Sequence, residues 1–83
     1  MGPWDRNGMR NPSGVAVDGD GAAYVVDRGN HRVQRFSAAG EFLGSWGGVG
    51  TGAGQFVGPA GIALSPGGDA YVVDAGNDRV QCV

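Results

Sequence analysis

Apolar residues along the chain form runs of about five, separated by clusters of Gly, Asp, Asn and Pro. The runs are rich in β-branched and aromatic residues and show no helical period, so they predict β-strands joined by tight turns. Turn signals such as Asp18-Gly19-Asp20-Gly21 make neighbouring strands antiparallel. The first four strands are expected at about residues 13–18, 22–27, 32–37 and 41–46, which together form a four-stranded antiparallel meander.

The run Ala-Tyr-Val-Val occurs twice, at residues 23–26 and 70–73. Successive side chains of a strand point to opposite faces, so four apolar residues in a row indicate a strand that is covered on both faces. The run belongs to a longer repeat at an offset of 47 residues, in which residues 11–36 align without a gap on residues 58–83. Fourteen of these 26 positions are identical, which excludes a chance match.

A sheet buried on both faces and repeated at such a period predicts β-propeller blades. We therefore expect an all-β protein with two blades in one module that spans residues 1–83. The first repeat is expected at about residues 9–46, the connector at 47–57 and the second repeat at about 58–83. The connector is rich in glycine, with five in the eight residues 47–54, and either slack between blades or a mobile lip would explain them.

Three spaced signals in each repeat resemble the NHL-repeat β-propeller family. They are Pro-x-Gly-(Val/Ile)-Ala-(Val/Leu), Gly-x-Ala-Tyr-Val-Val-Asp and Gly-Asn-x-Arg-Val-Gln. His31 lies where that family has its namesake Asn-His segment, and Asp78 replaces this histidine in the second repeat. The chain is also similar to designed propellers built from NHL-like blades, so a natural and an engineered origin both stay open.

The second repeat reaches Val83 after only three expected strands. Because Gly2-Pro3-Trp4 resembles Gly44-Ser45-Trp46, we expect residues 1–5 to supply the missing outer strand to a neighbouring chain. Two blades leave two outer sheet faces of roughly 300 Å² each, which together exceed the largest apolar patch expected on a soluble monomer. We therefore expect a homotrimer that forms one six-bladed ring, six being the blade count that the resemblance implies. The alternative is a fragment of a longer NHL propeller with sensor activity or with lyase or lactonase activity.

Composition narrows the possible partners. The chain has 18 glycines but is 41% apolar with a net charge of only −2, which argues against disorder. Six arginines and no lysine give a pI near 4.9, so we expect no nucleic-acid partner. No apolar run is long enough to cross a membrane and the start resembles no secretory signal, so we expect a soluble protein without a membrane partner; its localisation stays open.

The single cysteine, Cys82, excludes an internal disulfide and is expected to be a passive packing residue.

No motif predicts catalysis, a cofactor or a metal. His31 is the only histidine, so the chain lacks the histidine set that the metal-binding lyases of the family would require. The turn at 18–21 resembles the start of a calcium loop, but position twelve of such a loop is Gly29 instead of a glutamate. The Gly-x-Gly pattern at 48–53 is not followed by a helix, which a dinucleotide site needs. We therefore expect no enzyme.

Binding is expected at the turns between the second and third strands of each blade. In a meander these turns and the connector emerge on one side, where they suit contact with a peptide or a protein. The candidate binding residues are Arg28, Asn30, His31, Arg32, Asn77, Asp78 and Arg79. The repeated pairs Asp27 with Arg32 and Asp74 with Arg79 are expected to have a structural role, in which the carboxylate accepts hydrogen bonds from the turn and from the arginine.

Overall fold

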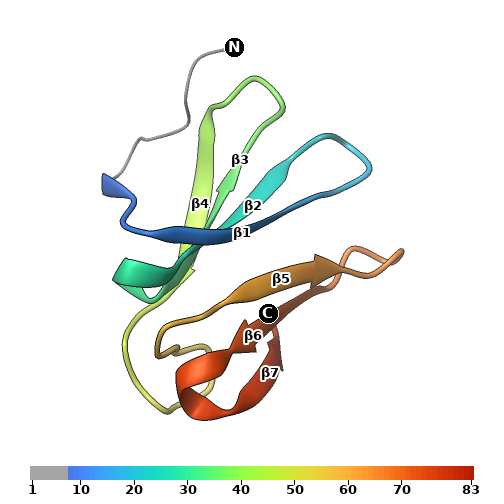
Figure 1. The fold of residues 1–83 in the computed structure, drawn as a ribbon. Helices are drawn as coiled ribbons and strands as arrows, with labels where there is room; N and C mark the ends of the chain where they lie inside the picture. Colours follow the sequence, from blue (N-terminus) through green and yellow to red (C-terminus); the bar gives the residue numbers. More distant parts are fainter. Residues whose placement is uncertain (1–7) are drawn as a thin grey trace.

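Two antiparallel sheets make up the part of the chain that the structure, a computed structural model, describes, which is residues 8–83 (Figure 1). Blade 1 has the strand order β1-β2-β3-β4 and blade 2 has the order β5-β6-β7. The strands are β1 (Pro12–Val17), β2 (Ala23–Asp27), β3 (Arg32–Phe36), β4 (Phe42–Gly47), β5 (Gly61–Leu64), β6 (Ala70–Asp74) and β7 (Arg79–Cys82). The expected all-β meander is confirmed, and each strand of blade 1 begins and ends within one residue of its expected position.

The hairpins after the first strand of each blade close in different ways. In blade 1 the Oδ1 of Asp18 accepts hydrogen bonds from the N–H groups of Asp20 and Ala22, at 2.9 and 3.0 Å. In blade 2 the Oγ of Ser65 accepts a hydrogen bond from the N–H of Asp69 at 3.1 Å. Side chains that bond to the backbone in this way stabilise a tight turn, so both turn sequences do what their composition predicts.

The turn between the second and third strands is a short 3-10 helix in each blade, η2 (Arg28–Asn30) and η3 (Ala75–Asn77). Glycine and asparagine are the residues that usually take the left-handed conformation in such a turn, but here they do not. That conformation falls on His31, with φ 53°, and on Asp78, with φ 51°. Gly29 is needed for a close approach instead, because a Cβ there would lie 2.7 Å from the carbonyl oxygen of Arg10.

The two blades pack face to face, with β1 beside β5 (Figure 1). At this seam, a Cβ on Gly14 would lie 3.2 Å from the Cα of Gly61, so the strands approach as closely as two glycines allow. The hydrophobic core lies between the two blades. Its centre is Val26, Val33, Phe56 and Val72, all 0% exposed, with Tyr24, Trp46, Ile62 and Val83 packed around it.

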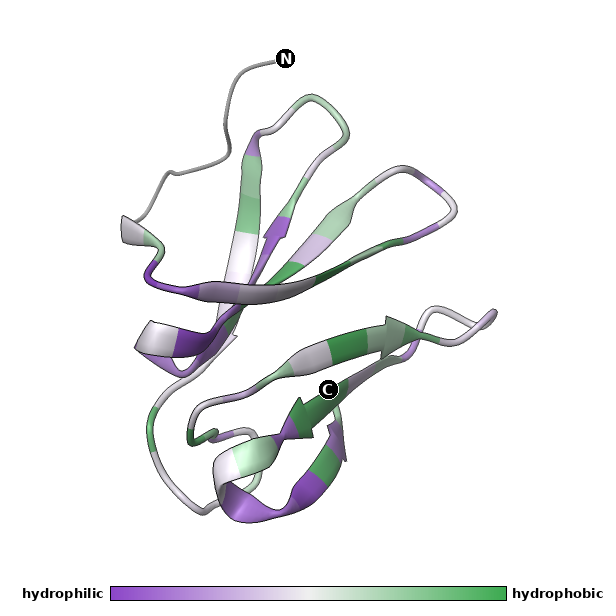
Figure 2. Cartoon of the chain, viewed as in Figure 1, coloured by the Kyte–Doolittle hydropathy of each residue, from purple (hydrophilic) through white to green (hydrophobic). Residues whose placement is uncertain are grey.

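The outer face of blade 2 is exposed, whereas that of blade 1 is exposed at Val15 and Val17 of β1 and buried at Val25 of β2. Val73 and Val80 are 44% and 62% exposed, although their counterparts in blade 1, Val26 and Val33, are fully buried. The expectation that both Ala-Tyr-Val-Val strands are covered on two faces is therefore right for β2 and wrong for β6, because no third blade covers β6. Figure 2 shows apolar residues along β5, β6 and β7. Cys82 shares this exposed face of β7, which corrects the expectation that it is a packing residue.

Candidate functional site

A buried carboxylate organises the turn of blade 1. Asp27 ends β2 and is fully buried. Its Oδ1 accepts a hydrogen bond from the N–H of Arg10 at 2.7 Å. Its Oδ2 accepts three more, from the side chains of Asn30, Arg32 and Gln34, at 3.0, 2.8 and 3.1 Å. The aspartate thus joins the chain that enters the blade, the turn and the third strand.

Asp74 has the same set of partners in blade 2. It accepts hydrogen bonds from the N–H of Val57 at 2.8 Å, from Asn77 at 2.9 Å, from Arg79 at 2.9 Å and from Gln81 at 3.3 Å. Every donor lies 47 residues after its counterpart in blade 1. Two copies of one network at equivalent positions indicate that it belongs to the architecture of each blade.

Burial and hydrogen bonding act on these two carboxyl groups in opposite directions. Burial has the largest effect and by itself raises the pKa of each group, because it penalises the charged form. The accepted hydrogen bonds together outweigh burial, so the pKa of Asp27 and the pKa of Asp74 both lie below the ordinary aspartate value. Both groups are therefore carboxylates at neutral pH and stabilise the fold in that form.

Arg79 also holds the glycine-rich connector. Beyond its ion pair with Asp74, its guanidinium donates to the carbonyl oxygens of Thr51, Gly52 and Gln55 at 2.8 to 2.9 Å. Gln81 adds hydrogen bonds from Gly54 and to Gln55. These contacts argue against both explanations for the five glycines, slack between the blades and a mobile lip, because the connector is attached to blade 2 at several points.

Most of the expected binding residues make contacts within the chain. Asn30 and Asn77 each donate a second hydrogen bond to a backbone carbonyl, that of Gly8 at 2.8 Å and that of Gly50 at 3.0 Å. The Nδ1 of His31 accepts a hydrogen bond from the N–H of Gly58 at 2.9 Å. Arg32 and Arg79 are the ion-pair partners of the buried aspartates.

The two remaining candidates, Arg28 and Asp78, are exposed. Arg28 lies in the seam between the blades, where its Nε is 3.6 Å from the position of a Cβ on Gly58. Asp78 lines an open hollow of about 460 Å³ on the exposed face of blade 2. The structure thus divides the expected site between two places, one inside the seam and one on a free face.

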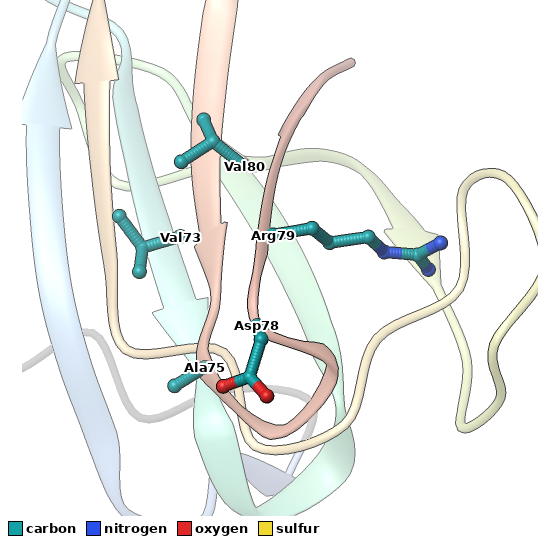
Figure 3. Close-up of a pocket in the computed structure, with 5 residues that line it drawn as sticks. All are labelled: Val73, Ala75, Asp78, Arg79 and Val80. Atoms are coloured by element: carbon teal, nitrogen blue, oxygen red, sulfur yellow. The ribbon is translucent and has the colours of Figure 1, made fainter.

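The hollow has an apolar floor and a charged margin. Val73, Ala75 and Val80 line it together with Asp78 and Arg79. The two valines point to one side, whereas the side chain of Arg79 extends to the other, toward the connector (Figure 3). Asp78 is therefore the charged group best placed to receive a hydrogen-bond donor that enters the hollow.

Sequence reasoning missed the glutamines and the backbone donors of the two networks. Gln34 is fully buried with its amide on Asp27, and Gln81 has the same contact with Asp74. The signal was present, because both glutamines fall at the 47-residue offset. The N–H groups of Arg10 and Val57 carried no such signal, because any residue except proline supplies one.

Within residues 8–83, no three His, Cys, Asp or Glu side chains gather in a way that could hold a metal ion. Nor does any helix in this part of the chain have the length and apolar character needed to cross a membrane.

Stacked antiparallel meanders, joined by a connector and built on a repeated carboxylate network, are the blades of a β-propeller. The NHL repeat family matches the chain twice, at residues 9–36 and 56–83, which together cover more than half of it. The chain therefore belongs to the NHL-repeat family, as its motifs predict. No curated protein matches the chain.

Proposed function

We propose that this chain is a two-blade building block that associates head to tail with copies of itself and presents the turns of the completed propeller to a protein or peptide. NHL repeats suggest a β-propeller-type protein-binding module. The observation that carries the proposal is the relation between the two exposed faces. Each is the repeat equivalent of a face that is buried in the seam inside the chain.

The seam inside the chain serves as the template. Blade 1 contributes Val26 and Val33 to it, and blade 2 contributes Ile62 and Val72. The counterparts of the blade 1 residues are Val73 and Val80, which are exposed on blade 2. On the other side of the molecule Val15, the counterpart of Ile62, is 61% exposed, whereas Val25, the counterpart of Val72, is already buried. Blade 2 of one copy can therefore pack against blade 1 of the next. Such a heterologous contact forms a closed ring when the rotation from one copy to the next divides a full turn.

Three copies would supply six blades, so a homotrimeric ring is the closed form that we propose. Apolar side chains exposed on both sides, Val15 and Val17 on blade 1 and Val73 and Val80 on blade 2, favour association over a dispersed monomer. The edge of β7, beside which residues 8–83 place no further strand, supports the same arrangement, because its counterpart β3 pairs with β4 along the whole strand.

The N-terminal segment is the proposed partner of the β7 edge. Asn30 bonds to the carbonyl of Gly8 as Asn77 bonds to the carbonyl of Gly50. This equivalence has an offset of 42, which aligns Trp4 with Trp46. We propose that residues 1–5 of one copy pair with β7 of the next as β4 pairs with β3; these residues lie outside those that the structure describes.

A non-catalytic role is part of the proposal. The two buried carboxylates each accept four hydrogen bonds that hold a blade together, and His31 accepts one across the seam. Groups engaged in this way are poorly placed to transfer protons to a substrate. The turns and the connector, exposed on one side of the blades, are the surface that we propose for a protein or peptide ligand.

Gly61 offers a direct test of self-association. In the isolated chain a Cβ on Gly61 meets nothing within 4 Å, whereas a Cβ on its counterpart Gly14 would press on the neighbouring blade. Gly61→Val should therefore fold as the parent chain does but block the seam between copies. Gly19→Ala, in a hairpin where a Cβ also meets nothing within 4 Å, is the matched control.

Light scattering coupled to size exclusion, with circular dichroism as the folding check, gives the mass of each variant. The proposal predicts a trimeric mass for the parent chain and for Gly19→Ala, and a folded monomer for Gly61→Val. A parent chain that is a folded monomer at high micromolar concentration would contradict it, and so would a Gly61→Val variant that still forms the trimer.

A further inference from the structure

The hollow beside Asp78 has a fully occupied counterpart inside the chain. There Phe56 is completely buried against Val26 and Val33. Two residues later, the N–H of Gly58 donates to the Nδ1 of His31 at 2.9 Å. The segment that leads into blade 2 thus docks on blade 1 through one apolar side chain and one backbone hydrogen bond.

The residues that lie 47 positions after this docking site on blade 1 line the hollow on blade 2. Val73 and Val80 are the counterparts of the two valines that hold Phe56, and Asp78 is the counterpart of His31. The segment that leads into blade 1 is residues 9–11, with Met9 in place of Phe56. Its last residue, Asn11, has φ 49°, and Gly58 has φ 54°, so both have the same left-handed backbone conformation.

We infer that the hollow beside Asp78 binds residues 9–11 of a second copy of the chain, with Met9 on the two valines and the N–H of Asn11 donating to the Asp78 carboxylate. This inference rests on the self-association proposed above and identifies the contact that makes it specific. Methionine suits such a hollow, since its flexible thioether side chain fills irregular apolar space. A hydrogen bond to a carboxylate is stronger than one to a neutral acceptor, so Asp78 replaces His31 without loss of an acceptor.

The pair of residues beside this contact differs between the two seams, but in each seam one member is large and the other is small. In the seam inside the chain the long Arg28 side chain lies next to Gly58, which has no side chain. In the seam between copies Ala75, the counterpart of Arg28, would lie next to Asn11. A large residue is thus matched with a small one in both seams. The mismatched pair, Arg28 with Asn11, would crowd the turn, so the exchange favours the pairing of blade 2 with blade 1 of another copy over a pairing of two copies of blade 1.

Paired variants at Met9 and Asp78 test the contact. Met9→Ala removes the apolar side chain and should weaken association by about tenfold or more, as expected for a lost buried side chain. Met9→Phe introduces the residue of the internal seam and should preserve association. Asp78→Gly removes the acceptor at a position whose φ of 51° suits glycine, so the fold should persist while association weakens by about tenfold. Asp78→His restores an acceptor and should restore association.

Sedimentation equilibrium over a range of concentrations measures these changes, with circular dichroism to verify that each variant folds. The inference is overturned if the parent chain associates and Gly61→Val blocks it, yet Met9→Ala and Asp78→Gly both associate as the parent does. That result would leave the proposed function intact. A parent chain that does not associate at all would overturn both. If Met9→Ala fails to fold, the test rests on the two variants at the exposed Asp78. Asp78→Gly should then weaken association and Asp78→His should preserve it, and the inference is overturned if Asp78→Gly associates as the parent does.

Discussion

Replacing Asp27 by asparagine tests whether the carboxylate network holds a blade together. The substitution keeps the shape of the side chain and removes its charge. Three donors converge on Oδ2, whereas Oδ1 accepts only the N–H of Arg10. If the new amide nitrogen takes the place of Oδ2, it faces three other donors. If the amide flips, its nitrogen faces the Arg10 N–H instead, so neither orientation satisfies the site.

The magnitude follows from which donors can find water. In the first orientation the fully buried amide of Gln34 loses its partner, and in the flipped one the N–H of Arg10 loses its acceptor, at a cost of about 1–3 kcal/mol in either case. Arg32 is 27% exposed and can turn partly to solvent, so its lost ion pair costs less than the 3–5 kcal/mol of a fully buried pair, about 1–2 kcal/mol. We expect a total loss of about 3 kcal/mol in the free energy of unfolding. For 83 residues at ~0.05–0.15 kcal/mol each, that is a large share of the whole stability.

Urea denaturation followed by circular dichroism at pH 7 measures this loss. The protein concentration must be the same for all variants, because association adds to the apparent stability. With a slope of about 1 kcal/mol per molar urea, the midpoint should fall by about 3 M or the chain should be unfolded without urea. Asp69→Asn, an exposed aspartate in a hairpin, is the control and should change stability by less than about 0.5 kcal/mol. If Asp27→Asn matches this control, the network contributes nothing and the reasoning is refuted.

Three further predictions concern acid, one glycine and the thiol. The two buried aspartates have a lowered pKa in the folded state, so their stabilisation is complete above the ordinary aspartate pKa of 3.8 and is lost as the pH falls through their lower folded values. A urea midpoint that stays constant or rises from pH 5 to pH 2.5 would contradict this. Gly29→Ala should lower the free energy of unfolding by about 2 kcal/mol, because its Cβ would lie 2.7 Å from the carbonyl oxygen of Arg10. Gly19→Ala should be nearly neutral, and thermal unfolding of both variants measures the difference. Cys82 is exposed on the face that we propose to be covered in the ring, so its reaction with Ellman's reagent should slow as the protein is concentrated and stay fast in Gly61→Val; equal rates would argue against burial of that face.

The strands, the hairpins and the repeat could be predicted from the sequence because they depend on local signals. Apolar runs and turn residues at fixed positions are properties of neighbouring residues, and they place each strand of blade 1 within one residue. The offset of 47 residues is visible in the sequence itself. The family follows from the same motifs. The ion pair of each aspartate with an arginine five residues later is local in this sense too.

Contacts between distant residues decided the rest. The left-handed conformation of His31 and Asp78, the close approach at Gly29 and the attachment of the connector to Arg79 all depend on segments that meet only in the folded chain. Burial is the clearest case. The two Ala-Tyr-Val-Val runs are identical in sequence, yet β2 is covered on both faces and β6 on one, because a strand cannot encode which neighbour is present. That neighbour is what the proposed association would supply.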